Sequence, residues 1–202
     1  MRSVFLFMLI LFCKPLYALQ LDGIIEVSKS GISLTNRQDS KIYFIEGANT
    51  QLRSQLKKLR TGDFVSVEAQ LKTIKNLPGA VVRSINFVGL QTLIGTWHNV
   101  SEPFCYTFVN YNQFTVSKRL KNDCNETEHD SDYSYIINPD VASWVFLVSG
   151  ERNSYVGELK VLGTERLEIN LYDSESGDIL RKLNLRRFKE VHANPRSKKS
   201  TL

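Results

Sequence analysis

Short runs of β-branched and aromatic residues recur along almost the whole chain, and they restrict the fold more than any other feature of the sequence. Apolar and polar residues alternate within these runs, and clusters of Gly, Asn, Asp and Ser separate one run from the next. This pattern is typical of short antiparallel strands joined by tight turns. We therefore expect an all-β protein with very little helix.

One segment breaks the β pattern and predicts a single short helix. Leu52, Leu56 and Leu59 follow one another at spacings of four and three residues, which places them on one face of a helix. Thr50 is the expected N-cap, and Gly62 is the expected stop signal. The chain is therefore expected to form three strands, this helix and two further strands in its first half.

This order of elements over residues 21–90 resembles that of an OB-fold domain. The Gly62-Asp63 pair also resembles the G-D-x-V junction that links helix and fourth strand in that family. The resemblance implies an OB-like five-stranded barrel over residues 19–90. OB-folds usually present their second and third strands, and their loops, to oligonucleotides or oligosaccharides.

The third expected strand offers little for such recognition. Tyr43 and Phe44 are adjacent, so they point to opposite faces and one of them belongs to the core. Lys41 and Arg37 lie nearby, but so does Asp39. Nucleic-acid-binding OB-folds stack bases on aromatic side chains above a positive groove. We keep a nucleic-acid or oligosaccharide binder as an alternative and do not favour it.

The second half of the chain opens on a Gly-x-Trp sequence that ends at Trp97. This opening resembles the first strand of lipocalins and related calycin barrels. Seven further strand-like runs follow, at residues 104–109, 114–120, 132–137, 144–148, 155–162, 166–172 and 179–188. Eight consecutive antiparallel strands can close into an up-and-down barrel. We therefore expect a small eight-stranded antiparallel lipocalin-like barrel over residues 91–189. The resemblance also implies that Arg186 or Arg187 lies across Trp97.

An eight-stranded barrel is just wide enough for side chains to fill it or to hold one small ligand. We expect a packed interior with at most a small pocket, because the residues expected to point inward are bulky. These residues are Tyr106, Phe108, Phe114, Tyr133, Tyr135, Trp144 and Phe146. An apolar small molecule is the natural occupant of such a pocket. The candidate ligand-binding residues are Trp97, Tyr135, Trp144 and Arg186.

Residues 1–18 have the pattern of a secretory signal peptide. Arg2 precedes an apolar run over residues 4–12, and Ala18 offers a small residue at the cleavage point. That run is shorter than the roughly 18 residues that a membrane-spanning helix needs, and no later stretch is long and apolar enough. We expect an exported protein that is secreted or periplasmic, with a bacterial envelope favoured.

The cysteines fit an oxidising compartment. Cys13 belongs to the expected leader, which leaves Cys105 and Cys124 in the remainder of the chain. Two thiols in such a compartment most simply form a disulfide. Closing this loop contributes about 3 kcal/mol in the chain-entropy treatment. The alternative is a cysteine nucleophile with a histidine partner.

Charge is distributed unevenly along the chain, whose formal net charge is +5. Residues 19–180 hold 16 Lys and Arg against 20 Asp and Glu, whereas eight Lys and Arg and only Glu190 follow from Arg181 onward. Residues 190–202 are basic and show no apolar periodicity, so we expect a disordered tail. Such a tail is suited to contact an anionic surface.

No catalytic motif stands out. The sequence has no nucleophile elbow, phosphate-binding loop or paired-histidine motif. The acidic run at residues 125–132 lacks the Gly and the final Glu of an EF-hand loop. We expect no catalytic residues, metal or cofactor, and a binding protein for a small apolar ligand or an envelope component. The rival is a secreted hydrolase or metal-dependent enzyme that uses His98, Glu158 and an acid from residues 126–132.

Overall fold

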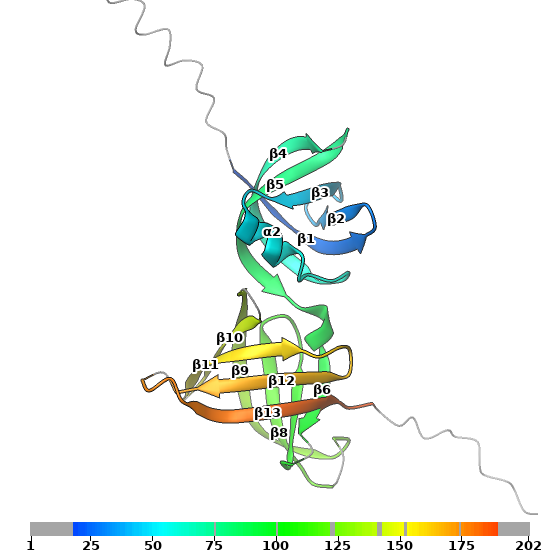
Figure 1. The fold of residues 1–202 in the computed structure, drawn as a ribbon. Helices are drawn as coiled ribbons and strands as arrows, with labels where there is room; N and C mark the ends of the chain where they lie inside the picture. The colour runs from blue at the N-terminus through cyan, green and yellow to red at the C-terminus, as the bar shows by residue number, and fades with distance from the viewer. Residues whose placement is uncertain are drawn as a thin grey trace, which may run out of the picture. The chain divides into compact units, whose positions relative to one another are not determined.

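The computed structural model of the chain describes residues 18–74, 76–99, 101–121, 124–140, 143–151, 153–173 and 175–189. Nearly all of the expected signal peptide and the basic tail at residues 190–202 lie outside the described residues. The chain divides into two compact units, one ending at Val88 and the other beginning at Gly89. Both units are built from β-strands (Figure 1), which confirms the expected fold class.

The first unit is a closed ring of five strands with one helix. Its elements are β1 (Leu19–Ser28), β2 (Gly31–Asn36), β3 (Ile42–Gly47), α2 (Thr50–Leu56), β4 (Phe64–Ile74) and β5 (Leu77–Gly89). Strand β1 pairs with β2 and β4, β2 pairs with β3, and β5 joins β3 to β4. The β3–β5 pair is parallel, so it needs a crossover connection, which α2 and β4 provide.

Helix α2 is shorter than expected and has a different N-cap. The side chain of Asn49, not that of Thr50, accepts a hydrogen bond from the backbone N–H of Leu52 at 2.9 Å. The helix ends at Leu56, and its buried residues are Leu52 and Leu56. Asn is one of the most favourable N-cap residues. Thr50 follows one position later in the chain, so its side chain does not take the cap position for the Leu52 N–H group.

The Gly62-Asp63 pair builds the turn that leads into β4. Gly62 has a φ of 95°, a left-handed conformation that favours glycine. The carboxylate of the buried Asp63 accepts a hydrogen bond from the backbone N–H of Arg60 at 2.7 Å. The Asp63 carbonyl accepts from Ile25 of β1. This turn therefore ties the end of the helical segment to the barrel wall.

The second unit is a closed ring of eight antiparallel strands. They are β6 (Gly95–Asn99), β7 (Phe104–Phe108), β8 (Gln113–Arg119), β9 (Thr127–Pro139), β10 (Trp144–Gly150), β11 (Ser154–Val161), β12 (Arg166–Tyr172) and β13 (Ile179–Arg187). Each strand pairs with the next, and β13 pairs with β6 to close the barrel. All eight expected strands are present, and β9 starts earlier than the expected residue 132.

Arg187 and Trp97 pack together where the last and first strands of the second barrel meet. Trp97 is fully buried and donates its indole N–H to the carbonyl of Leu93 at 2.7 Å. The guanidinium of Arg187 lies 4.3 Å from the centre of the Trp97 ring. It also donates to the carbonyls of Ile94 and Thr164, both at 2.9 Å. The implied contact across Trp97 is therefore made by Arg187, whereas Arg186 is exposed.

Candidate ligand pocket in the second barrel

A cavity of about 350 Å³ lies inside the second barrel. Its lining comes from seven of the eight strands, β7 to β13, and is mostly aromatic and aliphatic: Phe104, Tyr106, Phe108, Phe114, Val116, Asp130, Tyr133, Phe146, Val148, Tyr155, Ile169, Leu171, Leu180, Arg181 and Leu183. Small-molecule sites commonly have volumes of about 300–1,000 Å³. The bulky inward side chains therefore fill the barrel only in part, and a pocket of the expected small kind remains.

Packed aromatic rings form the floor of this cavity. Phe108 stacks on Phe114 with ring centres 5.1 Å apart. Tyr135 contacts Phe108 edge-on, with ring centres 5.3 Å apart. Phe146 packs against Tyr135 at 5.5 Å. The hydroxyl of Tyr135 donates to the carbonyl of Asn110 at 2.8 Å, and burial raises the pKa of this hydroxyl. Ring pairs in these arrangements contribute about 0.5–1.5 kcal/mol each beyond simple burial, so they stabilise the packing of the floor.

The four candidate ligand-binding residues do not line the cavity. Trp97 packs under the guanidinium of Arg187, and Tyr135 packs against Phe108 of the cavity lining. Trp144 is buried on β10, and Arg186 is exposed on β13. Ligand binding by these residues stays a prediction. The arginine that does line the cavity is Arg181.

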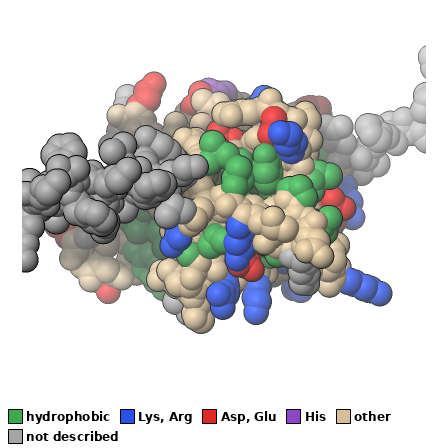
Figure 2. Space-filling view, turned by 90° about the horizontal axis from the view of Figure 1, so that it is seen from above, with side chains coloured by type: hydrophobic (Ala, Val, Ile, Leu, Met, Phe, Trp, Pro, Cys, Tyr) green, Lys and Arg blue, Asp and Glu red, His purple; other side chains and the backbone are tan. Residues whose placement is uncertain are grey.

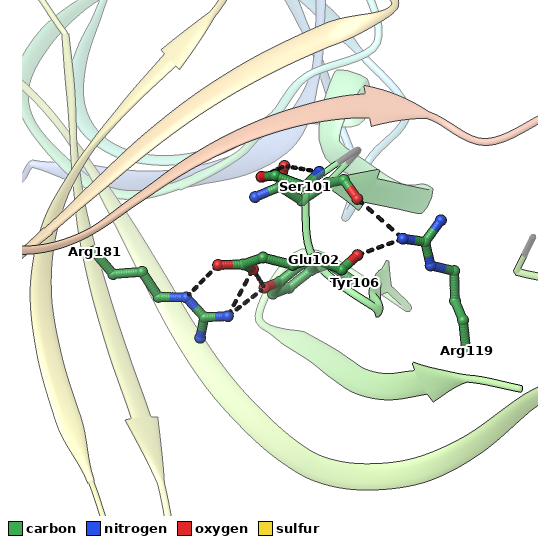
Figure 3. A network of polar contacts seen from close by, with 6 residues as sticks. Ser101, Glu102, Tyr106, Arg119 and Arg181 are labelled. Carbon is green, nitrogen blue, oxygen red and sulfur yellow. Dashed lines mark hydrogen bonds and ion pairs between the residues drawn. The ribbon is translucent and has the colours of Figure 1, made fainter. Parts of the chain in front are cut away.

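Arg181 lies at the opposite end of β13 from Arg187 and forms a polar cluster at the cavity wall (Figure 3). Its Nη2 lies 2.7 Å from Glu102 Oε2, and its Nε donates to Glu102 Oε1 at 3.3 Å. The same Nη2 donates to the hydroxyl of Tyr106 at 3.2 Å, and that hydroxyl lies 3.1 Å from Glu102 Oε2, to which it donates. A two-point Arg–carboxylate pair of this kind fixes the geometry of both side chains.

The charges in this cluster compensate one another. Burial by itself would raise the pKa of Glu102, but the hydrogen bonds and charge of Arg181 outweigh burial and lower it below the usual value. Burial raises the pKa of the Tyr106 hydroxyl far above its usual range. At neutral pH the cluster therefore consists of one cation, one anion and one neutral phenol.

A second arginine holds the turn that carries Glu102 in place. Arg119 of β8 donates from its Nη2 to the backbone carbonyls of Glu102 and of Asn99, the latter at 3.3 Å (Figure 3). The side chain of Asn99 accepts from both the N–H and the hydroxyl of Ser101. These bonds hold the backbone of the turn in place and so fix the position from which the Glu102 carboxylate extends.

The disulfide is attached to β7, one of the strands that line the cavity. Cys105 and Cys124 are bonded, with their Cα atoms 6.0 Å apart, which confirms the predicted pairing. Cys105 lies on β7 between Phe104 and Tyr106, both of which line the cavity. The bond thus anchors the loop after β8 to the strand that carries Tyr106.

The residues of the rival enzyme hypothesis do not form a metal site. Within the described part of the chain, no group of three or more His, Cys, Asp and Glu is arranged to hold a metal ion. Glu158 pairs with Lys160 at 3.2 Å, and His129 pairs with Asp132 at 3.4 Å. Burial, together with nearby Arg119 and Arg186, lowers the pKa of His98.

The first barrel exposes an apolar row on its outer face. Thr35 of β2 lies opposite both Ile24 and Ile42, and Ile24 also lies opposite Phe64. Ile24 and Ile42 are 43% and 53% exposed. In the space-filling view of Figure 2, hydrophobic side chains gather near the middle of the visible face, with Lys and Arg side chains around them.

The aromatic residues of the third strand behave as expected. Tyr43 is buried, and its hydroxyl donates to Asp39 at 3.0 Å, whereas Phe44 points to the other face and is half-buried. Glu26 shares the outer face with Ile24, two residues away on β1. On β1 this face therefore places an acidic side chain beside an apolar one, whereas single-stranded nucleic acids are bound in positive grooves.

Comparisons with known proteins add no functional information. No family model matches the chain, and searches of curated proteins and of solved structures find no match either. Among the described residues, no helix has the length and apolar character needed to span a membrane.

Proposed function

We propose that this chain is an exported, non-catalytic binding protein that holds one small, largely apolar molecule inside its second barrel. The observation that carries the proposal is the cavity of about 350 Å³, walled by aromatic and aliphatic side chains and carrying one compact polar cluster around Arg181. Ligand sites in proteins typically combine apolar walls with a few fixed polar groups.

We further propose that the two barrels are OB-like and lipocalin-like. The ring order β1-β2-β3-β5-β4, with the helix between β3 and β4, supports the first assignment. The up-and-down ring of eight strands and the Arg187–Trp97 contact support the second. Barrels of this second kind hold single small ligands in their interior.

The proposed location is outside the cytoplasm, in a secreted or periplasmic compartment. The Cys105–Cys124 disulfide supports this, because structural disulfides persist mainly in oxidising compartments. The signal-peptide pattern of residues 1–18 points the same way. The position of Glu26 beside Ile24 on the outer face of the first barrel gives no support to the nucleic-acid alternative.

The test is a pair of Val→Phe variants on neighbouring strands. Val148 is buried and lines the cavity, so Val148→Phe fills part of it; Val156 is exposed on β11, so Val156→Phe leaves the interior unchanged. Calorimetric titration of the purified chain with 1-decanol should give saturable binding for the wild type. We expect Val148→Phe to weaken it by about tenfold or more and Val156→Phe to leave it unchanged.

Two results would overturn the proposal. The first is a wild-type chain that binds no member of a panel of small apolar compounds. The second is a folded Val148→Phe variant, with an unchanged circular dichroism spectrum, that binds as tightly as Val156→Phe.

A further inference from the structure

We infer that the pocket selects an uncharged amphiphile, with an apolar body and one neutral hydrogen-bonding head group, over an anionic amphiphile such as a carboxylate. This inference rests on the proposed function and specifies its ligand class. It follows from the size of the cavity and from the charges of the side chains that line it.

The cavity sets the size of the ligand. Its volume of about 350 Å³ corresponds to that of roughly twelve liquid water molecules at about 30 Å³ each. An apolar molecule of about ten to twelve non-hydrogen atoms fills this space. Phe108, Phe114 and Phe146 offer it an aromatic floor, and Ile169 and Leu183 offer an aliphatic wall.

The polar cluster sets the place of the head group. Arg181 uses Nε and Nη2 to bind Glu102 and Tyr106, and neither of these residues engages its Nη1. Arg181 lines the cavity, and we assign Nη1 as the donor for a ligand oxygen. A hydroxyl or carbonyl oxygen can accept that hydrogen bond without bringing a charge into the barrel.

The charge balance argues against an anion. Arg181 is the only Lys or Arg among the described residues that line the cavity, and Glu102 already neutralises it. Asp130 is the other charged residue of the lining, and it adds a negative charge. A carboxylate moved from water to this site would find no uncompensated cation, and desolvating a charge without such a partner is costly. A neutral head group does not incur that cost.

A set of probes with one chain length tests this. The full chain is titrated with 1-decanol and decanoate at about pH 8, where the acid is charged. We expect 1-decanol to bind about tenfold or more tightly than decanoate. Decanoate binding as tightly as 1-decanol would overturn this inference but support the proposed function. The absence of binding by both compounds would overturn the inference and the proposed function together.

The variant Glu102→Gln provides an independent arm. It removes the carboxylate that neutralises Arg181 and keeps a side chain of similar size. We expect its affinity for decanoate to rise about tenfold and its affinity for 1-decanol to change by less than about threefold. The control Glu46→Gln removes the carboxylate of a Lys72 ion pair in the first unit and should change neither affinity. A folded Glu102→Gln variant that still binds decanoate no better than the wild type overturns the inference.

Discussion

The guanidinium of Arg187, on the last strand of the second barrel, lies 4.3 Å from the centre of the fully buried Trp97 ring on the first strand of that barrel. Because β6 and β13 are the strands that close the ring, this contact joins its two ends. The hydrogen bonds of Arg187 to Ile94 and Thr164 extend the junction to the turns on either side. Arg187 is therefore expected to contribute more to stability than any other arginine of the last strand.

Replacing Arg187 should destabilise the second unit specifically. We expect Arg187→Ala to lower its free energy of unfolding by about 2–4 kcal/mol, because a partly buried cation–π contact and charged hydrogen bonds are lost together. Denaturant unfolding followed by tryptophan fluorescence measures this, since Trp97 and Trp144 both belong to the second unit. Arg186→Ala is the matched control, with a change within about 0.5 kcal/mol. Equal effects of the two variants would contradict the prediction.

The disulfide should stabilise the same unit. We expect the double variant Cys105→Ala/Cys124→Ala to lose about 2–4 kcal/mol in the free energy of unfolding, because the loop after β8 regains its freedom in the unfolded chain. Tryptophan fluorescence in denaturant again gives the value. Wild-type protein titrated under denaturing conditions should show no free thiol at these two cysteines. Two reactive thiols would contradict the pairing itself.

The Glu102–Arg181 pair should make stability depend on pH. The pKa of Glu102 is lowered in the folded chain, so its contribution is fully present above its usual value of 4.5 and is lost as the pH falls through the folded-state pKa. We expect the wild type to be more stable than Glu102→Gln at neutral pH, with the difference shrinking on acidification below about pH 4.5. Thermal unfolding at several pH values measures both curves. A difference that stays constant down to the acid-unfolding limit would refute this assignment.

Two arginines face each other on the outside of the second barrel. Arg166 of β12 lies directly opposite Arg186 of β13, and Arg186 lies opposite His98 of β6. Like charges directly across a strand pair are unfavourable, and opposite charges are favourable by about 0.2–1 kcal/mol. We expect Arg186→Glu to raise the free energy of unfolding by about that amount, and Arg186→Gln to raise it by less. A loss of stability in Arg186→Glu would contradict the prediction.

The strands were predictable because apolar and polar residues alternate along them. The same alternation also indicates which arginines of β13 share a face with its buried leucines. Leu183 and Leu185 are buried on β13. Residues two positions apart share a face, so Arg181 and Arg187 lie on the same face as the leucines and Arg186 lies on the other. Arg181 stands near the start of the strand, and its side chain is 43% exposed. Extending that two-residue period along the strand would have selected Arg187 over Arg186 for the Trp97 contact and would have nominated Arg181 for the interior.

Contacts between residues far apart in the chain depend on closure of the ring, and the sequence around each residue does not indicate them. Glu102 lies in the turn after β6, and it meets Arg181 only because β13 returns to pair with β6. The N-cap of α2 is a different case: Asn49 and Thr50 are both good capping residues, and a shift of one position decides which side chain reaches the Leu52 N–H group. Patterns identify elements reliably, whereas contacts between distant elements follow from topology.

The pairing of Leu185 with Asn99 has a consequence for how the protein matures. A nascent chain that lacks its last strand has no partner for the first strand of the second barrel, so this unit cannot complete its fold until Arg187 has been synthesised. Structures dominated by such distant pairings also fold slowly. The growing polypeptide therefore keeps the second unit open until the end of its synthesis.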